Sequence, residues 1–194
     1  TSSPNSCAAG QRCGADGTCE PIPCTEGNAC AANHRCNVGS AKAGDWVLDV
    51  FAGSGTSLIE GQRLGRNTIG IELQPQVARM ARKSIASEPN AFDVVSQVVC
   101  GDSATIDAKK LLRAHGQESA QLVIMHPPYF DIIKFSEDER DLSNAPSVEA
   151  FLETIGRVVD NVSPLLHRGR YLAVVIGDKY ANGEWVTRGF RMID

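Results

Sequence analysis

The sequence lacks an apolar run long enough to cross a bilayer, which takes about 20 consecutive apolar residues. Its apolar stretches are short, as in residues 172–176, and no charged leader followed by an apolar block stands at the N-terminus. The chain also lacks an excess of basic residues, because its formal net charge is −4 and residues 41–194 hold 17 Lys and Arg against 20 Asp and Glu. We therefore predict a protein with no membrane span, whose affinity for nucleic-acid phosphates depends on local clusters of basic residues.

Large apolar residues are almost absent from residues 1–40, and cysteine is almost absent beyond them. This segment holds two Cys-x5-Cys-x5-Cys units, made of Cys7, Cys13, Cys19, Cys24, Cys30 and Cys36. A segment without a hydrophobic core needs covalent staples, and gaps of five residues are longer than the Cys pairs typical of zinc modules. We therefore predict disulfide-type repeats and no metal site, although the pairing stays open and metal binding by these cysteines and His34 is the alternative.

Short apolar runs alternate with segments of helical period from residue 41 onward. The pattern predicts strands at 46–51, 68–73, 94–100, 122–125 and 171–176, and helices at 56–64, 76–87, 106–114 and 147–166. In the second helix the apolar residues Val77, Met80, Ala81 and Ile85 are expected on one face. Continuous apolar strands that alternate with helices indicate an α/β fold, with a mostly parallel sheet covered on both faces. The predicted domains are 1–40, the Cys-rich segment, and 41–194, the α/β domain.

The first predicted strand ends in a glycine-rich turn, Ala52-Gly53-Ser54-Gly55-Thr56. Glycines permit a positive φ and let a ligand approach the backbone, and the following helix N-terminus offers N–H groups to an anion. A dinucleotide fingerprint has a third glycine where this chain has Leu58, so NAD is disfavoured. The turn therefore predicts a different cofactor.

Carboxylates end the next two predicted strands. Glu72 follows Asp49 by 23 residues and is placed to accept both hydroxyls of a ribose, while Asp102 is placed to accept an adenine amino group. Carboxyl ends of parallel strands share one sheet edge, where ligands of such sheets bind. The glycine turn and the two acids together predict an adenosine-bearing cofactor without phosphates.

The stretches Asp-Val-Phe-Ala-Gly-Ser-Gly-Thr at 49–56 and Leu-Gly-Arg-Asn-Thr-Ile-Gly-Ile-Glu at 64–72 resemble the cofactor-binding region of the DNA amino-methyltransferases. These enzymes make N4-methylcytosine or N6-methyladenine, as in restriction–modification systems. The resemblance implies a Rossmann-like methyltransferase sheet and S-adenosylmethionine as cofactor, with Phe51, Gly53 and Gly55 around it and Glu72 on its ribose. The predicted cofactor residues are Asp49, Phe51, Ala52, Gly53, Ser54, Gly55, Thr56, Glu72, Leu73 and Asp102.

His126-Pro127-Pro128-Tyr129 follows the fourth predicted strand and resembles the acceptor-Pro-Pro-aromatic catalytic motif of that family. Hydrogen-bond acceptors on the two protons of an amino group draw its nitrogen toward tetrahedral geometry, so that the lone pair can attack a methylsulfonium. The first side chain and the carbonyl of Pro127 supply two acceptors, the prolines fix the backbone, and Tyr129 can stack on a flipped base. These four residues are the predicted catalytic residues.

The first residue of the motif departs from the family, which usually has Asp, Asn or Ser where this chain has His126. Neutral imidazole has one acceptor nitrogen, but imidazolium has none. We therefore expect methyl transfer to slow as the imidazole is protonated. A histidine that only caps the strand end is the alternative.

Parts of the family pattern are not visible in this chain. No element resembling the one that packs the methionine end of the cofactor lies between Cys36 and Asp45, and no target-recognition region precedes Asp194. We therefore expect a sheet without its last strands and a domain incomplete at the C-terminus. Either the chain is a fragment, or a partner subunit supplies these parts, including target recognition on DNA, presented as a flipped base or a single strand.

The resemblance also implies a bacterial-type cytoplasmic enzyme, with which disulfide-type repeats conflict. Two other functions stay open. One is an RNA base or protein-glutamine methyltransferase, which uses a related acceptor-Pro-Pro-Tyr loop. The other is a degenerate module that holds the cofactor without turnover and carries extracellular Cys-rich repeats.

Overall fold

A computed structural model describes residues 42–129 and 134–177 in full, and the backbone of four short strands at 11–13, 19–21, 179–181 and 184–186. The chain divides into two compact units, Thr1–Ser40 and Ala41–Asp194. In the first unit, β1 (Gln11–Cys13) and β2 (Cys19–Pro21) pair antiparallel, with Cys13 opposite Cys19 in the register. The prediction of disulfide-type repeats concerns side chains outside the described residues.

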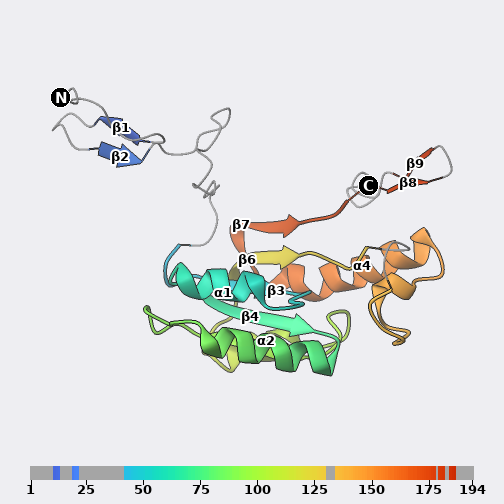
Figure 1. The fold of residues 1–194 in the computed structure, drawn as a ribbon, viewed down its shortest axis with the longest axis horizontal. Helices are drawn as coiled ribbons and strands as arrows, with labels where there is room; N and C mark the ends of the chain where they lie inside the picture. Colours follow the sequence, from blue (N-terminus) through green and yellow to red (C-terminus); the bar gives the residue numbers. More distant parts are fainter. Residues whose placement is uncertain are drawn as a thin grey trace. The chain divides into compact units, whose positions relative to one another are not determined.

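The second unit contains a five-stranded sheet in which every pair of neighbours is parallel (Figure 1). Its strands are β3 (Trp46–Asp49), β4 (Asn67–Glu72), β5 (Ser96–Cys100), β6 (Ala120–Met125) and β7 (Leu166–Val174), in the order β5-β4-β3-β6-β7. The chain builds outward from β3 to β5 and then crosses back to β6 on the other side of β3. Ligands of open α/β sheets bind at such a reversal, beyond the carboxyl ends of the strands.

Helices pack on both faces of the sheet. On one face, α1 (Thr56–Arg63) and α2 (Pro75–Ser87) bury a cluster that includes Leu58, Ala81 and Ile85. On the other face, α3 (Ala108–Arg113) and α4 (Val148–Val162) bury a larger cluster, in which Phe151 of α4 is fully buried. The predicted fold class, an α/β domain with a Rossmann-like parallel sheet, is confirmed.

Two short 3-10 helices and a second antiparallel pair complete the described elements. The helices are η1 (Leu142–Asn144) and η2 (Ser163–Leu165), and the pair is β8 (Lys179–Ala181) with β9 (Glu184–Val186). Within the part of the chain that the structure describes, no helix combines the length and the hydropathy needed to cross a membrane.

The boundary between α4 and β7 differs from the prediction of a helix over 147–166 and a strand from 171. The helix ends at Val162, η2 follows, and β7 begins at Leu166. Pro164 has no backbone N–H and cannot continue the hydrogen bonds of the α-helix, so the chain passes into a 3-10 turn. Gly169, at φ 78°, lies in a bulge where the β6–β7 register shifts. The bulge interrupts the strand pattern in the sequence, so the start of β7 before residue 171 was not predicted.

The expectation that Met80 lies on the buried face of α2 is wrong, because its side chain is 68% exposed. The buried residues of this helix are Ala78, Ala81 and Ile85. Met80 precedes Ala81 by one residue and therefore lies about 100° away around the helix. Small alanines at the contact let α2 lie close to the sheet.

The turn after β3 packs tightly on Gly70 of β4. A Cβ at Gly70 would lie 2.8 Å from the Cβ of Ala52 and 2.8 Å from Cδ1 of Leu58. By contrast, a Cβ at Gly156, on the exposed face of α4, would meet nothing within 4 Å. The lack of a side chain at Gly70 therefore allows the glycine turn and α1 to lie against the sheet.

Gly70→Ala is expected to lower the free energy of unfolding by about 1–3 kcal/mol, the usual cost of overpacking a core. Gly156→Ala is the matched control and is expected to raise it by about 0.5–1 kcal/mol, because alanine favours a helix interior. Urea unfolding of both variants measures the difference. Equal stability of Gly70→Ala and the wild type would contradict the close approach of the turn.

Candidate active site

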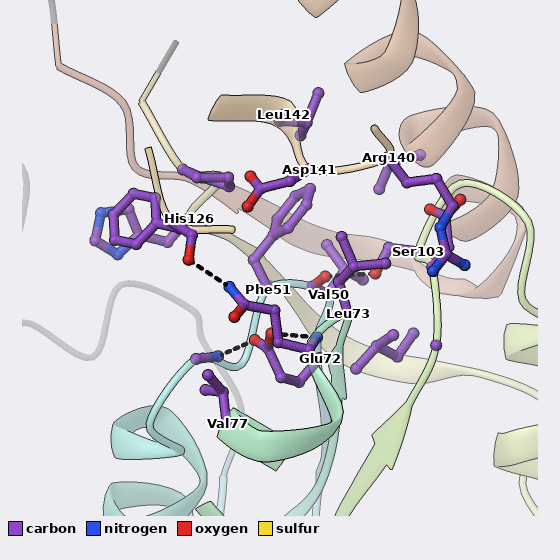
Figure 2. A pocket seen from close by; sticks show the side chains of 18 of the residues that line it. Val50, Phe51, Glu72, Leu73, Val77, Ser103, His126, Arg140, Asp141 and Leu142 are labelled. Carbon is purple, nitrogen blue, oxygen red and sulfur yellow. Dashed lines mark hydrogen bonds between the residues drawn. The ribbon is translucent and has the colours of Figure 1, made fainter. Parts of the chain in front are cut away.

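A cavity of about 310 Å³ opens at the carboxyl ends of the strands, at the reversal of strand order between β3 and β6 (Figure 2). Its volume lies at the lower end of the range for small-molecule sites, about 300–1,000 Å³. The ends of four different strands and the residues that follow them line it: Phe51, Gly53 and Ser54 after β3; Glu72 at the end of β4, with Leu73 and Gln74 after it; Asp102 and Ser103 after β5; His126 and Pro128 after β6. The structure thus brings the glycine turn, both predicted acids and the start of the catalytic motif to one cavity.

The glycine turn owes its shape to two left-handed residues, Gly53 at φ 52° and Gly55 at φ 84°. Gly53 lines the cavity, whereas Gly55 is the N-cap of α1 and Thr56 is its first residue. Ala52 is buried, and its N–H donates to the carbonyl of Ile71 at 2.9 Å. Ala52, Gly55 and Thr56 therefore shape the turn without lining the cavity.

Asp49 lies beneath the turn and does not line the cavity. Its carboxylate is 5% exposed and accepts hydrogen bonds from the backbone N–H of Phe51, at 3.0 Å, and from the hydroxyl of Ser57. Burial raises the pKa of Asp49, opposed by these two hydrogen bonds and by the charge of His126. Asp49 thus fastens the turn to α1, which sets the position of Phe51 and Gly53.

Glu72 connects the two turns that form the floor of the cavity (Figure 2). Its Oε2 accepts from the N–H of Gly53 at 2.9 Å, and its Oε1 accepts from the N–H of Gln74 at 2.8 Å. A carboxylate oxygen can accept two hydrogen bonds, so each of these oxygens keeps one acceptor position for a ligand hydroxyl. The backbone bonds fix the carboxylate in place, and the remaining positions suit a pair of vicinal hydroxyls.

Asp102 lies at the start of the turn after β5. Its Oδ1 accepts from the N–H of Ala104 at 2.9 Å, and its backbone carbonyl accepts from Thr105 and Ile106. The turn is joined to the floor of the cavity because the N–H of Gly101 donates to the carbonyl of Glu72 at 2.9 Å. Asp102 is therefore held at a fixed place beside Glu72, at the β5 side of the cavity.

His126 and Tyr129 lie close together at the opposite side. The Nε2 atom of His126 is 3.2 Å from Oη of Tyr129, and the two ring centroids are 5.8 Å apart. If Nε2–H donates to Oη, the lone pair of Nδ1 remains as an acceptor. Pro127 is buried and Tyr129 is half-buried near Gly177, so His126 and Pro128 line the cavity and these two residues do not.

The remaining wall comes from residues to which the sequence assigned no role. Phe135, Arg140, Asp141 and Leu142 line the cavity from the segment between the catalytic motif and α4, and Thr154 and Val158 line it from α4. In Figure 2, Asp141 and Leu142 face Glu72 and Leu73 across the cavity. Leu142, an isolated apolar residue in an acidic stretch, is the one sequence signal for an inward-facing wall.

A parallel sheet in this order, with a cavity built from its strand ends, defines a Rossmann-like α/β domain with a ligand site at the carboxyl edge of the sheet. Residues 35–83 match the family model described as DNA methylase. The resemblance to the DNA amino-methyltransferases predicted from the sequence is thereby confirmed for the part of the chain that carries the glycine turn and Glu72.

The chain is also similar to several relatives, each over part of its length. The chain is 43% identical over 54 residues to the type II methyltransferase M2.DpnII of Streptococcus pneumoniae, covering 28% of this chain and 20% of that protein. It is 38% identical over 63 residues to the type II methyltransferase M.HpaI of Haemophilus parainfluenzae, covering 32% and 20%. The chain is also 32% identical over 115 residues to a tRNA (guanine(10)-N2)-dimethyltransferase of Methanocaldococcus jannaschii. This longer match covers 58% of this chain and 31% of that protein. The chain thus spans less than a third of the length of each of these relatives.

Proposed function

We propose that this domain transfers a methyl group from S-adenosylmethionine to the exocyclic amino group of a DNA base, N6 of adenine or N4 of cytosine. One observation carries the proposal: four strand ends deliver a glycine turn, two carboxylates, and His126 and Pro128 of the His-Pro-Pro-Tyr motif to one cavity. The match of residues 35–83 to the DNA methylase family supports the same chemistry.

The residues around the cavity suit an adenosyl group. The acceptor positions left on Glu72 suit the two ribose hydroxyls, Asp102 suits the adenine amino group, and Leu73 and Leu142 supply apolar contact. The left-handed Gly53 lets the chain approach the ligand at the turn. The cofactor supplies a methyl group on a sulfonium, which an uncharged amino nitrogen can attack.

The catalytic motif prepares that nitrogen. Nδ1 of His126, with Nε2–H directed to Tyr129, accepts one amino proton, and the carbonyl of Pro127 accepts the other. These bonds localise the nitrogen lone pair, and after the attack the proton released from the nitrogen passes to Nδ1. The face of the Tyr129 ring serves as a stacking surface for a base that is flipped out of a duplex or presented on a single strand.

Target recognition belongs to another part of the assembly in this proposal. Residues 41–194 hold more acidic than basic residues, so phosphate contacts from this domain alone give weak affinity for DNA. A partner subunit, or a further part of a longer protein, supplies the contacts that position the DNA.

RNA is the second candidate substrate. The match to the tRNA dimethyltransferase covers 58% of this chain, about twice the share covered by the match to M2.DpnII, and that relative's name specifies N2 of guanine, another exocyclic amino group. The same acceptors at His126 and Pro127 serve an amino group on either nucleic acid.

A transfer assay decides between these substrates. The full chain is incubated with tritiated S-adenosylmethionine and, in parallel, with duplex DNA, single-stranded DNA, tRNA and protein, and labelled nucleosides are identified by mass spectrometry. We expect N6-methyladenine or N4-methylcytosine from DNA. N2-methylguanine from tRNA alone would replace DNA by RNA as the substrate. Calorimetric cofactor binding without transfer, at substrate concentrations high enough to offset the weak affinity of this domain, would overturn the catalytic proposal.

A further inference from the structure

The wall of the cavity opposite Glu72 is formed by the 134–144 loop, which connects the region of the catalytic motif to α4. We infer that this loop is a preformed part of the cofactor site, in which Asp138 holds the guanidinium of Arg140 over the adenine end and away from Asp102. This inference rests on the proposed function, because the adenine end is defined there by Asp102.

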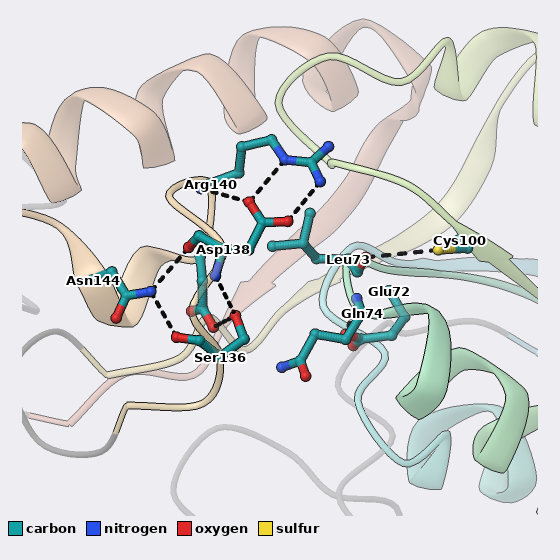
Figure 3. A network of polar contacts seen from close by, with 9 residues as sticks. Glu72, Leu73, Gln74, Cys100, Ser136, Asp138, Arg140 and Asn144 are labelled. Atoms are coloured by element: carbon teal, nitrogen blue, oxygen red, sulfur yellow. Dashed lines mark hydrogen bonds and ion pairs between the residues drawn. The ribbon is translucent and has the colours of Figure 1, made fainter.

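The loop is held in shape by its own polar side chains. Asp141 is 4% exposed and accepts from the hydroxyl of Ser136 at 2.6 Å and from the N–H and hydroxyl of Ser143 at 2.9 and 2.8 Å. The side-chain amide of Asn144 donates to the carbonyls of Ser136 and Asp138, at 2.8 and 2.9 Å (Figure 3). A buried carboxylate whose acceptor positions are filled by the same segment gives that segment a fixed shape without a sheet or a long helix.

The loop is also fastened to the rest of the domain at both ends. Near its start, Nε2 of Gln74 donates to the carbonyl of Phe135 at 3.4 Å, which joins the loop to the turn after β4. Near its end, the side chain of Leu142 is 6% exposed and packs in the larger core cluster. The wall is therefore held by contacts within the protein itself.

Arg140 is oriented by a two-armed contact with Asp138. Its Nε lies 2.9 Å from Oδ1 and its Nη2 lies 2.6 Å from Oδ2, while the N–H of Arg140 also donates to Oδ1 at 2.9 Å. The guanidinium holds the pKa of Asp138 at about 2, so the pair stays ionised at neutral pH. Exposed ion pairs contribute little to folding stability. The role of this pair is therefore to orient the guanidinium of Arg140.

The position of this pair decides what it can contact. Arg140 lines the cavity together with Leu73, Asp102 and Ser103, and Figure 3 shows the Asp138–Arg140 pair over Leu73 on the side of Cys100. The charge of Asp102 acts on Arg140, although no hydrogen bond joins the two side chains among the described contacts. A planar cation above an apolar floor is suited to stack on an aromatic ring.

The negative charge of Asp138 therefore keeps the guanidinium of Arg140 away from Asp102, which a neutral residue would not do. Two carboxylates, Asp138 and Asp102, compete for one guanidinium, and the two-armed contact with Asp138 leaves Asp102 able to accept from the adenine amino group. Without Asp138, Arg140 is expected to turn toward Asp102 and occupy its acceptor oxygens. Asp138 is thus a positioning residue, and Arg140 is a cofactor-contacting residue.

Calorimetry with S-adenosylhomocysteine tests Arg140. Arg140→Ala is expected to raise Kd about three- to fivefold, within the range of an exposed cation–aromatic contact, and Arg140→Lys to recover little of that loss because ammonium lacks the planar fork. The matched control is Arg113→Ala, since Arg113 makes a similar two-armed contact with Glu118 outside the cavity, with Nε–Oε1 and Nη2–Oε2 distances of 3.1 Å each. It is expected to bind within about twofold of the wild type.

A pair of nucleosides, adenosine and purine riboside, tests the role of Asp138. Adenosine and purine riboside differ only by the amino group, so the ratio of their Kd values measures the contact at Asp102. Asp138→Asn is expected to reduce the wild-type preference for adenosine, which a merely structural role of Asp138 would leave unchanged. A wild type that does not bind S-adenosylhomocysteine overturns the proposed function and this inference together. A wild type that binds it, with Arg140→Ala binding equally well or with the adenosine preference intact in Asp138→Asn, overturns this inference alone.

Discussion

His126→Ala is expected to lower the rate of methyl transfer by about 10³-fold, the size of the effects produced by general bases and oriented hydrogen-bond partners at reacting groups. Its affinity for S-adenosylhomocysteine is expected to stay close to that of the wild type. His126 lies at the side of the cavity remote from Asp102, and its ring nitrogen contacts Tyr129 rather than the floor residues. Single-turnover methylation and calorimetry on the same preparation separate the two effects.

A second substitution at the same position separates a proton acceptor from a structural cap. His126→Asn places an amide oxygen, which accepts hydrogen bonds at any pH, where the family usually has Asp, Asn or Ser. His126→Asn is expected to retain activity that His126→Ala loses, because the amide oxygen takes the place of the imidazole nitrogen as acceptor. His167→Ala, at an exposed histidine near the start of β7, is the control. A rate for His126→Ala within tenfold of the wild type would make His126 a cap on the strand end.

Much of the site follows from the sequence because the strand ends are marked by strong local signals. A short apolar run such as that in β3 indicates a buried strand, and Gly53 and Gly55 after it indicate a tight turn, which the structure shows with positive φ at both. Glu72 is placed by the next run in the same way. In a parallel sheet all such ends lie on one edge, so the meeting of the turn with the acids does not depend on exact element boundaries.

The 134–144 loop could not be predicted in the same way. Its shape depends on side-chain to backbone hydrogen bonds around Asp141, and such bonds have no period in the sequence. The acidic residues around it look like a solvated surface until the burial of Asp141 is known. Asp49 illustrates a related limit, since the sequence places it at the correct strand end but does not show that it lies below the turn and contacts Ser57.

Glu72→Ala is expected to raise the Kd for S-adenosylhomocysteine by about 10²–10⁴, because two hydrogen bonds to a charged acceptor contribute about 1.5–3 kcal/mol each. The substitution also leaves the N–H groups of Gly53 and Gln74 without their carboxylate partner. These groups border an open cavity, where water can take the place of the carboxylate, so we expect the fold to persist in urea unfolding.

The Kd of Glu72→Gln is expected to lie between those of the wild type and Glu72→Ala. The Gln amide retains one acceptor oxygen but turns a donor toward the N–H of either Gly53 or Gln74. Glu118→Ala, which removes an exposed carboxylate outside the cavity, controls for the loss of a negative charge. The order of affinities wild type, Glu72→Gln, Glu72→Ala then reports the number of acceptor oxygens that face the ribose. If Glu72→Ala bound as tightly as Glu118→Ala, the carboxylate would serve only to join the two turns, and the ribose would have to lie elsewhere in the cavity.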